Sequence, residues 1–272
     1  MKLTVLMDNN TYIDQYYLGE PAVSYYIEDG DVRMLLDCGY SDAFIRNAEA
    51  MEIDLSKLTH IVFSHGHDDH TRGLQFLHEQ FDLSNVEIIA HPDCFFPREE
   101  DGLGFGAPYV AEEVRGFAKL HLSAEPVWLT EQLVYLGQIA DNFDFEKRRP
   151  IGKRSCGTDC NSGWTDDYCY DDSALAYQSE EGLFIITGCS HSGICNITEQ
   201  AKRLCGDHRI AGILGGFHLF DVGDRLVKTI DYLQNCNIKD FYPCHCVSLK
   251  AKAKMMEKLG VEEVGVGLQI EI

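Results

Sequence analysis

The residues with the clearest chemistry lie between positions 65 and 70 of the 272-residue chain. His65, His67, Asp69 and His70 bring three imidazoles and one carboxylate into this short segment, and a borderline metal such as Zn²⁺ prefers these ligands. The alternating spacing directs His65 and His67 to one side of an extended turn, so that Asp69 and His70 can face a second metal. A solvated histidine-rich loop is the alternative. The strongly apolar strand predicted at 59–64, directly before the cluster, argues against it.

The predicted strands and helices that must position this cluster are distributed unevenly along the chain. The first part reads mainly as strands, and the last hundred residues alternate strands with helices, which is typical of a layered α/β domain. Polar clusters recur after predicted strands, where sites of such folds usually assemble. Strands are predicted at 21–28, 31–37, 59–64, 86–90, 183–187, 209–214 and 241–242, and helices at 41–51, 196–205, 222–235 and from 249 onward.

The segment 61–70 (IVFSHGHDDH) and the upstream 35–39 (LLDCG) resemble the signature of the metallo-β-lactamase superfamily. That resemblance implies an α/β fold, a four-layer αββα sandwich with one or two metals at the edge of its sheets. It extends over the whole chain, so we expect a single domain at 1–272. Irregular insertions are expected near 92–118 and 146–172.

Later segments resemble one subfamily of metal-dependent hydrolases, which is often described as similar to the dihydropterin ribofuranosylaminobenzene 5′-phosphate synthase of methanopterin biosynthesis. They are 187–194 (TGCSHSGI), 215–219 (GGFHL) and 243–246 (PCHC). The superfamily more often has small residues where this chain has Thr71-Arg72-Gly73. Arg72 either contacts an anion or is simply exposed.

The superfamily pattern implies which residues hold metal. His191 and His245 follow predicted strands and are expected to complete the metal shells. The expected ligands are His65, His67, Asp69, His70, His191 and His245, around one or two Zn²⁺ ions, with Mn²⁺ or Fe²⁺ as alternatives. Asp69 is also expected to act in catalysis. His218 is expected to donate a proton or hold the substrate, the alternative being a hydrogen-bonded histidine behind the site.

The cysteines leave open questions. Cys189 stands where the superfamily often has a metal-bridging Asp, so it is either a thiolate ligand or a small buried residue. For Cys156, Cys160 and Cys169 a separate metal site is the alternative, but they lack zinc-finger spacing and are expected to be loop thiols. Asp37 and His91 are expected to support the loops.

The charge balance restricts the partners. The chain has 23 basic and 44 acidic residues, a net charge of −21, which disfavours nucleic acid and anionic membranes as partners. The eleven cysteines are an odd number, and the first eight residues carry too short an apolar run for a signal peptide, so a cytoplasmic location is expected. The oligomeric state is not specified.

The expected function is that of a metal-dependent hydrolase, in which a metal-bound hydroxide attacks a small anionic substrate, with a phosphorylated one favoured. One alternative is a synthase of a pterin pathway, which condenses a phosphoribosyl donor with release of pyrophosphate. Another is a non-catalytic metal-binding or redox-sensing protein on the same fold.

Overall fold

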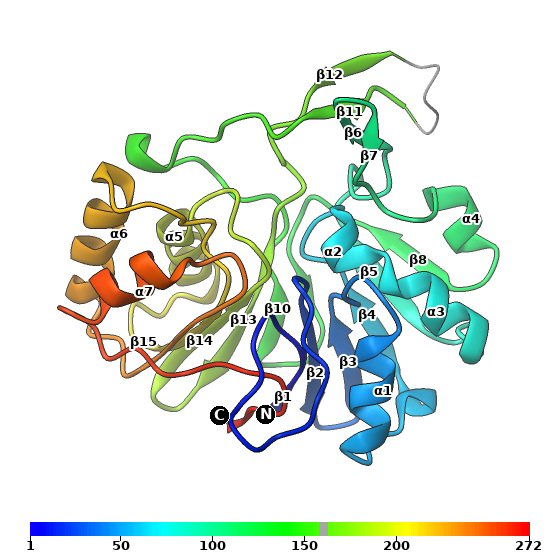
Figure 1. Cartoon of the computed structure of the whole chain (residues 1–272), viewed down its shortest axis with the longest axis horizontal. Coiled ribbons are helices and arrows are strands. Elements are labelled where there is room, and N and C mark those ends of the chain that lie inside the picture. Colours follow the sequence, from blue (N-terminus) through cyan, green and yellow to red (C-terminus); the bar gives the residue numbers. More distant parts are fainter. Residues whose placement is uncertain (158–162) are drawn as a thin grey trace. The chain divides into compact units, whose positions relative to one another are not determined.

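The computed structural model describes residues 1–157 and 163–272, so Cys160 lies outside the described residues (Figure 1). The chain divides into two compact units, each with its own sheet and apolar core. Unit 1 comprises Met1–Ala124, Arg149–Asp171 and Gly265–Ile272, and unit 2 comprises Glu125–Arg148 and Asp172–Val264. The single domain expected at 1–272 stays a prediction.

Unit 1 is built on a seven-stranded sheet with the order β17-β1-β2-β3-β4-β5-β8. The strands from β17 to β3 pair antiparallel, and those from β3 to β8 pair parallel. A tight turn at Gly30 and Asp31 joins β2 to β3. Gly30 has φ +58°, a backbone conformation that glycine adopts at no steric cost. The strands are β1 (Lys2–Met7), β2 (Ser24–Asp29), β3 (Val32–Leu36), β4 (His60–Val62), β5 (Glu87–Ala90), β8 (Lys119–Leu122) and β17 (Gln269–Glu271).

Helices pack against this sheet, and Figure 1 shows α1 and α3 beside its strands. Phe44 from α1 and Leu74 and Leu77 from α3 are buried in one apolar cluster with Leu35 and Ile61 of the strands. The helices of unit 1 are α1 (Ala43–Ala50), α2 (Asp68–Thr71), α3 (Gly73–Gln80) and α4 (Ala111–Arg115), with the 3₁₀ helix η1 (Leu55–Lys57).

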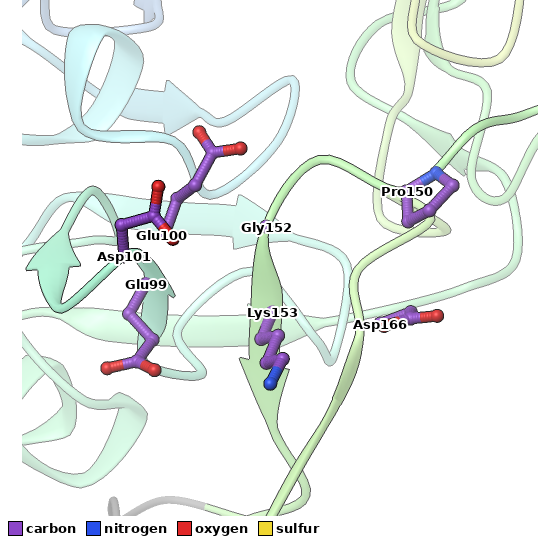
Figure 2. A pocket seen from close by; sticks show the side chains of 7 residues that line it. All are labelled: Glu99, Glu100, Asp101, Pro150, Gly152, Lys153 and Asp166. Atoms are coloured by element: carbon purple, nitrogen blue, oxygen red, sulfur yellow. The ribbon is translucent and has the colours of Figure 1, made fainter.

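The stretches expected to be irregular insertions contain short strands that form a small sheet in unit 1, with the order β12-β11-β6-β7. These strands are β6 (Arg98–Glu100), β7 (Leu103–Gly104), β11 (Lys153–Ser155) and β12 (Trp164–Asp166). Antiparallel pairing of β6 with β11 joins the first insertion to the second. A cavity of about 350 Å³ lies beside them, lined by Glu99, Glu100, Asp101, Pro150, Gly152, Lys153 and Asp166 (Figure 2).

Unit 2 is built on a six-stranded sheet with the order β16-β15-β14-β13-β10-β9. The strands β14, β15 and β16 are parallel, so their carboxyl ends lie at the same edge of the sheet. The strands are β9 (Val127–Trp128), β10 (Leu133–Tyr135), β13 (Ala174–Ser179), β14 (Gly182–Thr187), β15 (Ile210–Gly215) and β16 (Asp240–Pro243). The helices are α5 (Ile194–Cys205), α6 (Asp224–Asn235) and α7 (Leu249–Met255), with the 3₁₀ helix η2 (Asp144–Glu146).

The helices of unit 2 bury the apolar stripes that the sequence predicts. Ile197 and Ala201 of α5 and Leu226, Ile230 and Leu233 of α6 enter one core cluster. Each unit is therefore a sheet with helices packed against it, and the predicted α/β class is confirmed. In the described parts of the chain, every helix is too short or too polar to cross a bilayer.

Gly73 offers a test of how tightly the start of α3 packs. A Cβ atom at this position would lie 1.8 Å from the carbonyl oxygen of Cys38 and 2.9 Å from Cε1 of Phe44. We expect Gly73→Ala to lower the free energy of unfolding by roughly 1–3 kcal/mol, because the backbone must shift to accept the methyl group. Thermal unfolding measures the loss. Gly260→Ala is the control, because a Cβ there meets open space. Equal unfolding temperatures for the two variants would contradict this packing.

Candidate metal centre

The predicted cluster at 65–70 is brought together in unit 1, directly after β4. His65 and His67 lie on the loop that leaves the strand, and Asp69 and His70 lie in α2. The ring of His65 is 4.5 Å from that of His67 and 4.2 Å from that of His70, measured between ring centroids. All three imidazoles are buried, whereas the side chain of Asp69 is 29% exposed. Four predicted ligands therefore form one compact group of donors.

A buried carboxylate, that of Asp37, orients two of these rings. It accepts hydrogen bonds from the Ser64 backbone N–H at 2.8 Å, the Ser64 hydroxyl at 2.7 Å and Nδ1 of His70 at 2.7 Å. Since the Ser64 hydroxyl proton goes to Asp37, Nδ1 of His65, 3.0 Å from that oxygen, must carry the proton of its own bond. The Nε2 atoms of His65 and His70 are then the nitrogens with lone pairs. Asp37 thus supports the loop, as expected.

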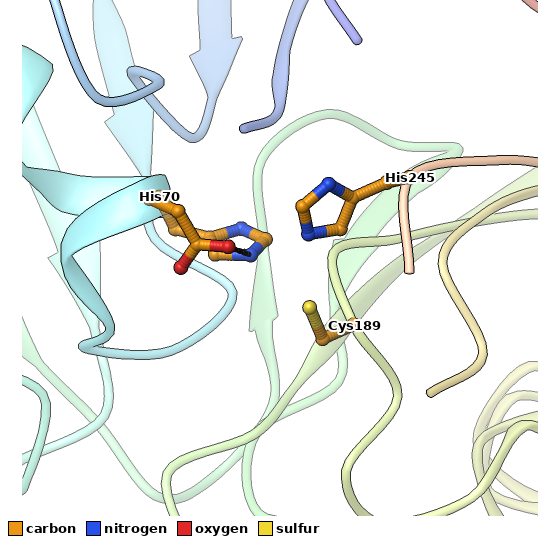
Figure 3. Close-up of side chains that lie close together, drawn as sticks. His70, Cys189 and His245 are labelled. Carbon is orange, nitrogen blue, oxygen red and sulfur yellow. Dashed lines mark ion pairs between the residues drawn. The ribbon is translucent and has the colours of Figure 1, made fainter. Parts of the chain in front are cut away.

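The donor chemistry of this group fits a divalent metal. Oδ2 of Asp69 lies 3.5 Å from Nε2 of His70, the contact drawn as a dashed line in Figure 3. Both atoms are acceptors in the tautomer that Asp37 imposes, and two acceptors at this distance repel unless a proton or a cation lies between them. A carboxylate on the far nitrogen of a histidine, like that of Asp37 on His70, also accompanies histidine ligands of zinc.

A buried arginine that the sequence analysis did not single out fixes the loop between His65 and His67. Arg98 donates to Asp167 at 2.8 Å and to Asp171 at 2.7 Å, and Asp171 also accepts the backbone N–H of Gly66 at 2.8 Å. Although burial favours the neutral acid, the charge of Arg98 holds the pKa of Asp171 below its ordinary value. Gly66 is held from both sides, since Arg98 also contacts its carbonyl oxygen.

Cys169, which the sequence predicts to be a loop thiol, lies beside the histidine cluster. Its Sγ atom is 3.5 Å from Nε2 of His67, and the residue is only 1% exposed. Cys156, by contrast, is exposed. No sequence pattern predicts this contact, because 102 residues separate Cys169 from His67.

In unit 2, a second group of donors follows the parallel strands. Cys189 and His191 come after β14, and His218 and His245 come after β15 and β16. The sulfur of Cys189 lies within 4.8 Å of a ring nitrogen of His191 and of a ring nitrogen of His245. Figure 3 shows Cys189 and His245. The ring centroids of His191 and His218 are 4.5 Å apart. The residues expected to act from this part of the chain therefore gather at one edge of the unit 2 sheet.

Hydrogen bonds to and from side chains hold these loops in place. The Ser190 hydroxyl donates to the carbonyl of Gly216 at 2.7 Å, and the backbone N–H of His218 donates to Sγ of Cys246 at 3.1 Å. A Cβ atom at Gly216 would lie 2.6 Å from Cys246 Sγ, so only glycine fits between these segments. Asp172 accepts both the backbone N–H and the hydroxyl of Ser192.

His218 is neutral in this setting. Burial, the neighbouring His191 and the charge of Arg225 together lower its pKa to about 3. At physiological pH the ring therefore carries a single N–H, which is suited to hold a substrate oxygen. An imidazolium, which the proton-donating alternative needs, is disfavoured.

Comparisons with known proteins agree with this fold. The family model of the metallo-β-lactamase superfamily matches residues 18–131. The chain is 30% identical over 266 residues to a Methanocaldococcus jannaschii protein named "Uncharacterized protein MJ0448", with 94% of each chain covered. It is also 30% identical over 236 residues to 7,8-dihydropterin-6-methyl-4-(beta-D-ribofuranosyl)-aminobenzene-5′-phosphate synthase of the same organism, with 83% of this chain and 79% of that one covered.

Among solved structures, the chain is similar to Tm1679, described as a metal-dependent hydrolase of the beta-lactamase superfamily. The TM-score is 0.83 at 26% identity, with 100% of this chain and 99% of that one covered. The chain therefore belongs to the metallo-β-lactamase superfamily, as its motifs predict. Members of this superfamily bind metal ions, often zinc, and most are metal-dependent hydrolases.

Asp37→Asn tests the orienting role of the buried carboxylate. Asparagine tolerates the left-handed backbone at this position, where φ is +61°, but its amide NH₂ cannot accept the proton of His70. We expect metal affinity to fall roughly 10–100-fold, the usual effect of removing such a partner. Competition with a chromogenic chelator measures this. The exposed Asp31→Asn is the matched control. Wild-type affinity in Asp37→Asn would show that His70 needs no such partner.

Proposed function

We propose that this protein is a metal-dependent hydrolase that acts on a small anionic molecule, with a phosphorylated one favoured. One observation carries the proposal: three buried imidazoles and the Asp69 carboxylate converge after β4, and Asp37 turns the His70 ring so that its Nε2 faces Asp69. Such a group of donors in a chain of this superfamily supports metal binding rather than a packing role.

The proposed ligands keep the superfamily pattern. Zn²⁺ is the favoured ion, as one or two ions, with Mn²⁺ or Fe²⁺ as alternatives. A bound cation of this kind lowers the pKa of water toward about 7 and stabilises charge that develops on a carbonyl or phosphoryl oxygen. The proposed ligands are His65, His67, Asp69, His70, His191 and His245.

The chain's own groups would then orient the reactants. The carboxylate of Asp69 is the most exposed of the unit 1 donors, so it can accept a hydrogen bond from an attacking water. The neutral ring of His218 can donate its N–H to a substrate oxygen. The exposed ring of Phe220, 4.8 Å from that of His218, offers an apolar face to the rest of the substrate.

A small anion fits the charge of the protein better than a polyanion does. The net charge of −21 repels long nucleic acids and anionic membranes, so we propose neither as a partner. A divalent cation among buried imidazoles is a local positive centre in that field, and it attracts a compact anion.

A second candidate function is a condensing synthase. The observation that favours it is the 30% identity to a relative whose name describes the synthesis of a ribofuranosyl-aminobenzene phosphate. This reaction needs the same cations but no attacking water. Release of pyrophosphate from a phosphoribosyl donor that requires an added aromatic acceptor and yields the coupled product would distinguish it from hydrolysis, which needs only water.

His67→Ala tests the proposed function directly. Protein purified without chelators should contain metal, and chelation should remove turnover that added Zn²⁺ restores. We expect His67→Ala to lose bound metal and to hydrolyse none of a panel of phosphoesters, lactones and thioesters, because the truncation removes a ligand. His121→Ala is the matched control, since the side chain of His121 is 44% exposed on β8. Elemental analysis and product release are the measurements.

Two outcomes would count against the proposal. Full activity in metal-free His67→Ala would remove the metal from the mechanism. Intact metal with no hydrolysis and no pyrophosphate release would favour the non-catalytic sensor instead.

A further inference from the structure

We propose that Cys169 is a thiolate ligand of the metal that His67 binds in unit 1. The inference rests on the proposed metal site. It adds one sulfur donor to the histidine nitrogens and the Asp69 carboxylate. The cysteine comes from the second insertion, in its part Arg149–Asp171 that belongs to unit 1, rather than from the histidine motif.

The distance between the two donor atoms supports shared ligation. Cys169 Sγ and His67 Nε2 are 3.5 Å apart. In a tetrahedral zinc site, Zn–N bonds of about 2.0–2.1 Å and Zn–S bonds of about 2.3 Å place the nitrogen and sulfur roughly 3.6 Å apart. The two side chains thus already have the separation of adjacent ligands, although they come from segments 102 residues apart.

The position of Cys169 is fixed by the network that also fixes the histidine loop. The backbone N–H of Cys169 donates to Oδ1 of Asp167 at 2.9 Å, and Oδ2 of Asp167 accepts from Arg98. Arg98 contacts the carbonyl of Gly66, the residue between His65 and His67. One buried guanidinium therefore sets the cysteine and the histidines relative to each other.

The backbone at Cys169 supports a specific role. Its φ is +49°, in the left-handed region that non-glycine residues rarely adopt, and such strain gathers at functional sites. The ring of His67 is held on another side by Phe105, whose centroid is 5.1 Å away in an edge-to-face contact. Cys169 and Phe105 together restrict the imidazole to one orientation.

Metal binding by Cys169 would have two chemical consequences that packing of a neutral thiol does not have. The thiol gives its proton to solvent and its sulfur lone pair to the cation, so metal uptake releases one proton from this residue. A thiolate also favours thiophilic ions such as Zn²⁺ or Co²⁺ over Mn²⁺ or Mg²⁺. A buried thiol that only donates a hydrogen bond to His67 would do neither.

Cobalt substitution tests the proposal by a readout other than activity. Co²⁺ bound to a thiolate shows a sulfur-to-metal charge-transfer absorption that nitrogen and oxygen ligands do not give. Because Cys189 is a second candidate thiolate, we compare full-length Cys189→Ser with Cys189→Ser/Cys169→Ser. Cys189→Ser/Cys156→Ser is the matched control, since Cys156 is an exposed thiol of the same insertion. Equilibrium dialysis measures the cobalt bound by each protein.

We expect the charge-transfer band in Cys189→Ser and in its Cys156→Ser derivative, and its loss in the Cys169→Ser derivative. The ratio of Zn²⁺ to Mn²⁺ affinity should fall in that last protein as well. Cobalt bound with equal absorption in all three proteins, or with no charge-transfer band in Cys189→Ser, overturns the role of Cys169 and leaves the proposed metal site intact. Failure of the wild-type chain to bind any metal overturns both.

If Cys169→Ser does not fold, a measurement on protein with an unchanged Cys169 still tests the proposal. X-ray absorption of zinc-loaded Cys189→Ser should show one sulfur at about 2.3 Å among nitrogen and oxygen ligands. A shell of nitrogen and oxygen alone would overturn the proposal without any change at Cys169.

Discussion

One buried charge, that of Arg98, organises unit 1 around the candidate metal centre. Its guanidinium is paired with Asp167 and Asp171 and also contacts the carbonyl oxygens of Gly66 and Cys94. An arginine without such partners could not be buried, and removing it would leave two buried carboxylates unpaired, a change that typically costs 3–5 kcal/mol. The insertions and the histidine loop are therefore tied to each other by this network.

Residues with a strained backbone are found at or beside the candidate donors. Nine non-glycine residues of the described ranges have positive φ, and five of them bear or support the candidate ligands. Each of these five lies one to three residues after the end of a strand, where an uncommon turn takes the side chain out of the strand direction. Stable parallel strands and their buried cores hold these turns in place. The five residues are Asp37, Cys169, Ser190, His218 and His245.

The sequence predicted those site residues and elements whose evidence lies within one short segment of the chain. His65, His67, Asp69 and His70 are close in sequence, and their spacing alone placed them in one cluster. The strands and amphipathic helices of unit 2 were predictable for the same reason, because their periodicity repeats within each element. Arg98 and Cys169 gave no such signal. Their roles arise from pairing between insertions some seventy residues apart or more, and no spacing rule relates them to the histidines.

A thiolate at Cys169 changes how the acidity of the chain bears on substrate choice. The carboxylate of Asp69 and one thiolate together carry two negative charges, which balance a single divalent cation. A unit 1 site with one metal would then be neutral, and the net charge of −21 around it would repel an anion. A second cation restores a positive centre of two charges. An anionic substrate and a Cys169 ligand are therefore compatible when two metals are bound, and this links the number of metals to the class of substrate.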